Sequence, residues 1–178
     1  MEHREALLGH WDAIPAGERT AALGGAWYKE GRREARVLAA RHGVSVRCAA
    51  GVIAALSPRM RWSVNLVAAE NLLAGEPNDR VAGYNANVAK ARRIANGERP
   101  LDVLGGPKVR AFYRAIMGER EEVVVDVWMA RAMGVAPEDV SARYAELAAA
   151  VADAARSVGV PAADFQALIW VHVRGGKA

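Results

Sequence analysis

Apolar side chains recur along this chain at intervals of three and four residues, and short Gly and Pro breaks interrupt the pattern. That spacing puts the apolar residues on one face of a helix, and it favours helices throughout. The predicted helices cover residues 3–14, 20–41, 46–56, 65–73, 83–94, 108–117 and 140–158, a segment that begins after Asp126, and residues 162–173. The chain is therefore predicted to be all-α.

The helix predicted at residues 46–56 differs from the others because it is apolar nearly all round and rich in Ala and Gly. Ser45 precedes it in the position of a helix cap. Its small residues allow another helix to approach closely. They are Ala49, Ala50, Gly51, Ala54 and Ala55.

Two helix starts in the stretch from Leu101 to Gly134 carry charged side chains. A Gly105-Gly106-Pro107 turn can lead directly into a helix, because glycine tolerates positive φ and proline suits the first helical position. Lys108 then lies in the first turn of that helix. Asp126 precedes Val-Trp-Met-Ala-Arg and is predicted to be the N-cap of the next helix.

The composition narrows the possibilities for function. The 178 residues suffice for one domain or two small lobes, and the net charge of +4 suits a polyanionic partner. The one cysteine, Cys48, excludes a disulfide framework and a four-cysteine metal or iron–sulfur site within one chain. The four histidines have no metal-ligand spacing, so we expect no metal and no cofactor. There is no apolar run of roughly 20 residues and no signal-peptide pattern, so we expect a cytoplasmic protein without a membrane partner.

Three segments together are similar to the helix-hairpin-helix DNA glycosylase superfamily, which includes endonuclease III and 8-oxoguanine glycosylase. The Gly-rich turn, Lys108 and the capping Asp126 have the family's order and spacing, although Leu104 stands where the hairpin's first glycine belongs. Leu56-Ser57 with Val64-Asn65 resembles a second family segment, with Arg59 in place of the usual Gln. Gly83-Tyr84-Asn85 through Lys90 to Ile94 looks like the segment that precedes the hairpin.

The resemblance implies a two-lobed helical glycosylase fold that lacks the family's iron–sulfur cluster. One lobe is expected to comprise residues 1–50 and 135–178, packed on a second lobe of residues 51–134. The implied partner of the monomer is double-stranded DNA with a modified or damaged base. The implied reaction cleaves the N-glycosidic bond of a flipped base: Asp126 stabilises the oxocarbenium ion, and Lys108 is a candidate Schiff-base nucleophile.

Other residues are candidates for the base pocket and for contacts with the DNA backbone. A flipped base requires a flat aromatic wall and polar groups that read its edge, and the candidates are Trp62, Asn65, Trp27, Tyr28 and Trp170. The expected DNA-binding residues are Arg59, Arg61, Lys90, Arg92, Arg93, Gly105, Gly106 and Arg110. A tryptophan of this kind is also an ordinary core anchor, and arginines on a helix also form solvated faces.

Three alternatives stay open at the level of the sequence. The first is a non-catalytic helix-hairpin-helix module that binds DNA, in which Asp126 only caps a helix. The second is a protein on the same fold that serves base hypermodification of phage DNA. The third is a helical protein that does not bind nucleic acid.

Overall fold

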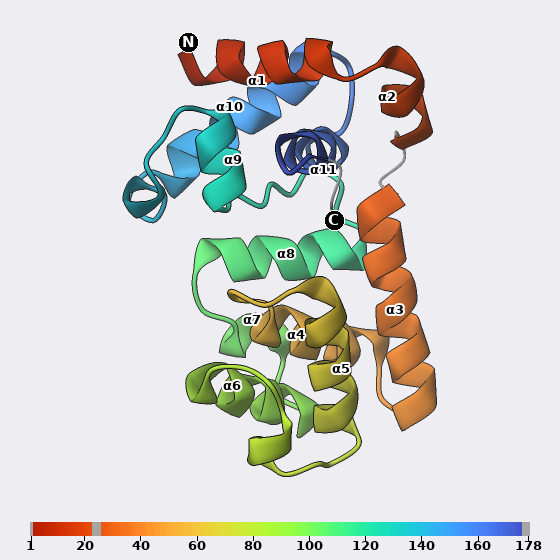
Figure 1. Ribbon diagram of the computed structural model, residues 1–178. Helices are drawn as coiled ribbons and strands as arrows, with labels where there is room; N and C mark the ends of the chain where they lie inside the picture. Colours follow the sequence, from red (N-terminus) through yellow and green to blue (C-terminus); the bar gives the residue numbers. More distant parts are fainter. Residues whose placement is uncertain (1, 23–25, 176–178) are drawn as a thin grey trace. The chain divides into compact units, whose positions relative to one another are not determined.

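The computed structural model describes residues 2–22 and 26–175, and all regular structure in these ranges is helical (Figure 1). This confirms the predicted all-α class. The chain divides into two units: unit 1 contains residues 1–28 and 119–178, and unit 2 contains residues 29–118.

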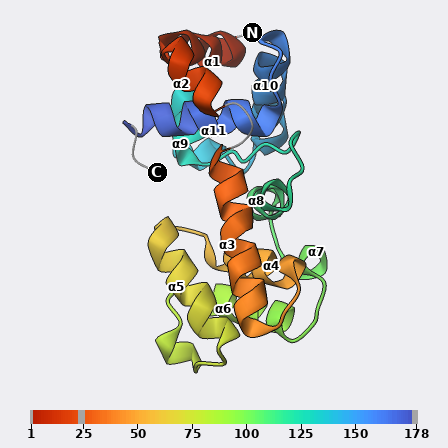
Figure 2. The ribbon, with the colours of Figure 1, turned by 90° about the vertical axis from the view of Figure 1, so that its right-hand side faces the viewer.

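Unit 1 is built around its last helix. α11 (Ala162–Val173) is apolar nearly all round, and such a helix has to be covered on several sides. The helices α1 (Glu2–Ala13), α2 (Ala16–Ala22), α9 (Val127–Ala132) and α10 (Tyr144–Ser157) all contact it (Figure 2). A short 3-10 helix, Pro137–Asp139, lies between α9 and α10.

Large side chains fill the core of unit 1. The rings of Trp11 and Phe165 stack with centroids 5.2 Å apart. Leu7, Leu147 and Ile169 are fully buried in the same cluster. The valines of residues 123–125, which precede α9, are buried as well. The segment that leads to Asp126 is therefore anchored by burial.

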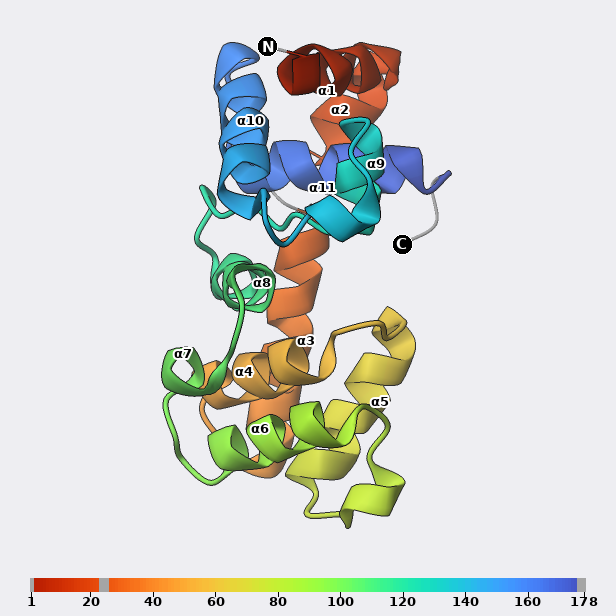
Figure 3. The same cartoon turned by 90° about the vertical axis from the view of Figure 1, so that its left-hand side faces the viewer.

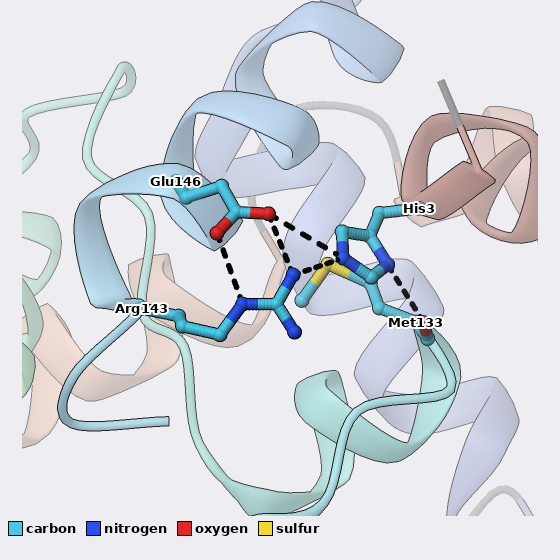
Figure 4. A network of polar contacts seen from close by, with 4 residues as sticks. All are labelled: His3, Met133, Arg143 and Glu146. Carbon is cyan, nitrogen blue, oxygen red and sulfur yellow. Dashed lines mark hydrogen bonds and ion pairs between the residues drawn. The ribbon is translucent and has the colours of Figure 1, made fainter. Parts of the chain in front are cut away.

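His3 ties three helices of unit 1 together (Figure 4). Its Nδ1 lies 2.9 Å from the Met133 carbonyl oxygen at the end of α9, and its Nε2 lies 2.8 Å from a nitrogen of Arg143. The same Nε2 lies 3.6 Å from Oε1 of Glu146. Arg143 in turn pairs with Glu146 on α10.

Unit 2 surrounds α4 (Val46–Leu56), whose residues 49–56 are all buried. The other helices of this unit are α3 (Ala26–His42), whose first residues belong to unit 1, α5 (Trp62–Leu73), the 3-10 helix Asn78–Arg80, α6 (Asn85–Ala95), α7 (Pro100–Val103) and α8 (Pro107–Met117). α5, α6, α7 and α8 contact α4 (Figure 3).

Close approach at Gly51 explains why α4 is rich in small residues. A Cβ atom at Gly51 would lie 2.7 Å from Cγ of Pro100 and 3.0 Å from Cγ2 of Ile94. The first residue of α7 and a core residue of α6 thus pack directly on the backbone of α4. The expectation that small residues on this helix permit close packing is met.

Glycines in the left-handed conformation end most of the longer helices. Gly75, Gly97, Gly134 and Gly159 follow α5, α6, α9 and α10 with φ between 69° and 103°. In each case the next residue's N–H bonds to the carbonyl five positions earlier, as Glu98 does to Arg93 at 3.1 Å. This is the Schellman motif, and it satisfies carbonyls that the helix leaves unpaired.

The predicted helices agree with the structure where caps are plain in the sequence. α4 has the predicted ends, and Ser45 caps it by accepting from the Cys48 N–H. Residues 140–143 precede α10, and α5 begins three residues before its predicted start. The single helix predicted at residues 20–41 overlaps two separate helices, α2 and α3, and residues 23–25 lie outside the described residues. A separate α2 and the short α7 were not predicted.

The predicted lobe boundaries at residues 50/51 and 134/135 are wrong, because the chain divides near residues 28 and 118. α3 belongs with unit 2: Arg41 and His42 at its end pair with Glu70 of α5. α9 belongs with unit 1, since Met129 and Ala130 are buried in that core. Hydrophobic periodicity does not show which neighbour a helix buries its face against.

No single helix among the described residues is long and apolar enough to cross a membrane. One pair, residues 27–42 and 46–56, reaches that length and composition together across a bend of 116°.

Candidate functional site

Asp126 is held by three hydrogen bonds at the start of α9. Its Oδ1 accepts from the backbone N–H groups of Trp128 and Met129 at 2.9 and 3.0 Å. Its Oδ2 accepts from Trp170 Nε1 of α11 at 2.9 Å. The predicted N-cap is confirmed. An ionised carboxylate offers about four lone-pair sites, so one remains open on this half-buried side chain.

Tyr144 of α10 fixes the strand-like segment that precedes Asp126. Its hydroxyl donates to the Val123 carbonyl at 2.9 Å and accepts from the Val125 N–H at 3.3 Å. Burial is the main reason that the pKa of Tyr144 is raised to about 12, and the carboxylates of Glu122 and Asp126 add to it. Tyr144 therefore stays protonated and bound to the backbone at neutral pH.

Arg120 anchors the beginning of the same segment on α11. Its carbonyl oxygen accepts from the Ala163 N–H at 2.8 Å. Its guanidinium pairs with Asp164, whose side chain is 2% exposed. The connection from residue 119 to Asp126 is thus fastened at both ends, which limits the positions that the carboxylate can take.

Aromatic side chains predicted for the base pocket gather next to Asp126. The ring of Trp170, whose Nε1 binds Asp126, meets the ring of Trp27 edge-on with centroids 5.9 Å apart. The rings of Trp27 and Tyr28 are 5.0 Å apart. The Tyr28 hydroxyl donates to Oε1 of Gln166 at 2.7 Å, and both residues are buried. Three of the five predicted pocket residues thus share one cluster with the predicted catalytic carboxylate.

The pKa of Tyr28 is affected by the nearby carboxylate of Asp126. This pKa is raised far above the usual value of a tyrosine, first by burial and then by electrostatic interactions with Asp126 and with Tyr144. The hydroxyl thus remains a donor, and Gln166 remains its acceptor. Gln166 itself is 3% exposed.

Three residues beside this cluster were not predicted as site residues. Cζ of Arg131 lies 4.7 Å from the centroid of the Trp128 ring, and Cζ of Arg174 lies 5.8 Å from it. Arg174 also lies 4.2 Å from the centroid of the Trp170 ring. Each arginine follows a tryptophan by three or four positions, so helical spacing alone could have indicated these pairs.

The predicted hairpin lies in unit 2, between α7 and α8. Gly106 is the N-cap of α8 with φ of 76°, a conformation that glycine adopts without a Cβ penalty. Pro107 and Lys108 are the first two residues of α8, and the Lys108 side chain is exposed, without a bonded partner in the described chain. A Cβ at Gly105 would lie 3.3 Å from Nζ of Lys90, so that amine is at the turn.

Arg59 has a strained backbone. Within the described ranges it is the one residue other than glycine with positive φ, at 59°. The Met60 N–H bonds to the Ser57 carbonyl at 3.1 Å, which closes a turn with Pro58 second and Arg59 third. Glycine or asparagine is usual at the third position of such a turn. Arg59 and Arg61 are both exposed.

The other predicted DNA-binding arginines of unit 2 already bind the chain itself. Arg92 donates to Asn78, to the Leu72 carbonyl and to the Glu76 carbonyl. Arg93 pairs with Glu98 at 2.5 Å, and Arg110 donates to the Leu101 carbonyl. These bonds hold the loops that flank α6 and α7, so a contact with phosphate would have to compete with them.

Trp62 and Asn65 lie in unit 2, apart from the other predicted pocket residues in unit 1. Cη2 of Trp62 would lie 3.7 Å from a Cβ at Gly31, so its ring packs on α3. Asn65 is 2% exposed and donates to the Ile53 carbonyl at 3.1 Å. That carbonyl is left over because the Ser57 N–H turns to Ala54 instead. Both residues thus have packing or capping roles in unit 2.

The structure thus shows an all-α protein with a fixed carboxylate, that of Asp126, in unit 1. This carboxylate lies beside the aromatic rings of Trp170, Trp27 and Tyr28. A family model described as a family of unknown function, DUF7178, matches residues 5–177, and the chain belongs to this family. No curated protein and no solved structure matches it. Within the described residues, no three His, Cys, Asp or Glu side chains are grouped to hold a metal ion.

Proposed function

We propose that this protein is a DNA glycosylase that cleaves the N-glycosidic bond of a modified or damaged base flipped out of duplex DNA. The observation that carries the proposal is the fixation of Asp126. Two backbone amides and the Trp170 indole hold both oxygens of its carboxylate and leave one lone-pair site open. A carboxylate held in one place stabilises the positive charge that builds on the sugar as the base departs, without reorganising during the reaction.

The aromatic cluster next to Asp126 supplies groups that suit a flipped base. Trp27 is partly exposed, and an indole ring is a surface on which a base can stack. The buried Gln166 places an amide beside this cluster, and its oxygen accepts from Tyr28. An amide of this kind can read polar groups on the edge of a base.

Features of unit 2 support DNA as the substrate. The turn at Gly105 and Gly106 precedes α8 without a side-chain cap, and Lys90 Nζ is at that turn. Free backbone N–H groups at a helix start and a nearby ammonium are suitable phosphate ligands. Lys108 follows in the first turn and would act as the Schiff-base nucleophile of a bifunctional enzyme. In a monofunctional enzyme, water replaces Lys108 and Asp126 orients the water.

The proposal gives Arg59 the role of filling the space left by the flipped base, as its place in the sequence motif implies. A left-handed arginine costs roughly 1 kcal/mol, so the turn keeps it exposed at the expense of stability. Such strain is typical of functional positions. Its forked donors can contact the base that is left without a partner.

The test is base release from duplex oligonucleotides that carry oxidised, alkylated, deaminated or hypermodified bases, with and without borohydride. We expect release from at least one member of the panel. A borohydride-trapped adduct that is lost in Lys108→Ala and retained in Lys29→Ala, a change of another exposed lysine, assigns the nucleophile. Release without any adduct assigns water. No release from the whole panel contradicts the proposed function.

A second candidate is a helix-hairpin-helix module that binds DNA without catalysis. The observation in its favour is that the bonds of Asp126 to Trp128 and Met129 are those of an ordinary helix cap. The two candidates differ in Asp126→Asn, since asparagine also caps a helix but cannot stabilise a cation with a full negative charge. Loss of base release with intact binding favours the enzyme.

A further inference from the structure

Two arginines of unit 1 lie over tryptophan rings without an ion-pair partner among the described residues. Arg19, Arg120, Arg143 and Arg156 each pair with an Asp or Glu side chain, and Arg19 also lies over the ring of Trp11. Arg131 and Arg174 lie over tryptophan rings as well, but neither has an ion-pair partner in the described chain. Their guanidinium groups are thus positioned by the indole rings while their charge stays uncompensated by a carboxylate in contact.

The rings also limit the directions in which these guanidinium groups can bind. Trp128 contacts both Arg131 of α9 and Arg174, the residue after α11. A guanidinium that lies over an aromatic face keeps N–H groups at its edge, and these are the donors that bind a phosphate in bidentate fashion. Arg131 is exposed and Arg174 is partly exposed, so the donors can be reached from solvent.

The two arginines are connected to Asp126 by short paths. Trp128 donates its backbone N–H to Asp126 Oδ1, and Trp170, over which Arg174 lies, donates its indole N–H to Asp126 Oδ2. α9 lies against the carboxyl-terminal half of α11, where these residues are (Figures 2 and 3). Each arginine thus lies over the ring of a residue that donates a hydrogen bond to Asp126.

We propose that Arg131 and Arg174, aligned by Trp128 and Trp170, bind two backbone phosphates of the DNA strand whose nucleotide is presented to Asp126. This inference rests on the proposed function. A nucleotide in a strand has one phosphate on each side of its sugar, and two guanidinium groups beside one carboxylate match that arrangement. The contact is independent of base identity, so it positions the sugar and does not choose the base.

The test measures how duplex affinity depends on salt, using a labelled duplex with a tetrahydrofuran abasic-site analogue and fluorescence anisotropy. Glutamine replaces each arginine because it keeps part of the stem that covers the ring. Each phosphate contact contributes about 0.9 to the slope of log affinity against log salt. Arg131→Gln and Arg174→Gln should each lower the slope by about 0.9, and the double variant by about twice that. Arg156→Gln, an exposed arginine of the same unit, should leave it unchanged.

Lysine variants distinguish the loss of a phosphate contact from a loss of folding. If the glutamine variants lose thermal stability, Arg131→Lys with Arg174→Lys keeps the charge and should keep most of the wild-type slope. An unchanged slope in the double glutamine variant overturns the proposal. An equal loss in Arg156→Gln also overturns it.

Competitors separate the sources of the anion. Displacement of the duplex by millimolar inorganic phosphate or by a nucleoside monophosphate would assign a free phosphate site and overturn the strand contact. Displacement by polyglutamate as effective as that by unlabelled duplex would assign an acidic protein partner and also overturn it. We expect only nucleic acid strands to compete.

The proposed function and this surface can fail separately. A lowered slope without base release from any substrate keeps the phosphate surface and removes the enzyme. Base release that depends on Asp126, together with an unchanged slope, keeps the enzyme and removes the phosphate surface.

Discussion

The central helices of the two units, α4 and α11, are both covered by other helices on several sides, but they pack through different side chains. α4 of unit 2 is lined by Ala and Gly, and its neighbours pack on its backbone at Gly51. α11 of unit 1 carries large apolar residues such as Phe165 together with buried Asp164 and Gln166. α4 contributes mainly close packing, whereas α11 also binds the segment before Asp126 and the aromatic cluster through hydrogen bonds. Buried polar groups on a central helix thus mark the unit where the candidate chemistry lies.

The largest expected effect on stability concerns α4. Gly51→Ala places a methyl group 2.7 Å from the Pro100 ring, which is rigid, so the helices of unit 2 must separate. We expect a loss of roughly 2–3 kcal/mol in the free energy of unfolding, measured by urea denaturation. Gly31→Ala is the matched control, because its Cβ would meet Ile116 at an ordinary 3.5 Å. Equal stability of the two variants would contradict the close approach.

A change of about 2 kcal/mol is expected at the polar contact of α11. Tyr28→Phe removes the hydroxyl that donates to Gln166 and leaves a buried amide oxygen without its bond. Thermal and urea unfolding measure the loss, and Tyr84→Phe, at a side chain 55% exposed, should change neither. An unchanged free energy of unfolding in Tyr28→Phe would mean that this hydrogen bond does not stabilise the protein.

Alkaline pH provides a smaller, graded test of unit 1. An unfolded tyrosine titrates near pH 10, whereas burial raises the pKa of Tyr144 to about 12 in the folded protein. The unfolded state therefore releases its proton first, and stability should be unaffected below pH 10 and fall between pH 10 and 12. The slope contributed by Tyr144 is about 1.4 kcal/mol per pH unit. Tyr144→Phe should make the fall shallower, and a parallel fall would contradict the burial of this hydroxyl.

The smallest expected effect is an increase in stability when Arg59 of unit 2 is replaced. Arg59→Gly relieves a backbone with φ of 59° and should stabilise the protein by roughly 1 kcal/mol. Under the proposed function, the same variant loses affinity for duplexes that contain a flipped base. Arg61→Gly, at the N-cap of α5 in extended conformation, gains no such relief. Stabilisation by Arg61→Gly but not by Arg59→Gly would contradict the inference that the backbone at Arg59 is strained.

Local signals in the sequence predicted the helices better than their grouping. Ser45 and Asp126 cap helices as predicted, because a cap depends on bonds within a few residues. The lobe boundaries were wrong because α3 and α9 choose their partners through long-range contacts such as that of His42 with Glu70. A single chain's periodicity does not contain that information.

The candidate site was predicted in part for the same reason. Trp27, Tyr28 and Trp170 gather near Asp126, whereas Trp62 and Asn65 pack within unit 2. An aromatic residue has the same helical spacing whether it lines a pocket or fills a core, so the sequence could not separate these cases. Arg131 and Arg174 were not predicted although each follows a tryptophan at helical spacing, because that spacing does not show whether the two side chains are in contact.

The most direct test of the account is the single-turnover rate of base release by Asp126→Asn, on whichever substrate the wild-type protein cleaves. Asparagine retains the cap of α9 through its oxygen but cannot accept from Trp170 Nε1, so thermal unfolding checks the fold of the variant, and duplex affinity should be preserved. We predict a rate lower by on the order of 10²–10⁴, with Asp153→Asn, an exposed carboxylate of α10, releasing the base at the wild-type rate. A rate for Asp126→Asn equal to that of the wild type would contradict the catalytic role of this carboxylate.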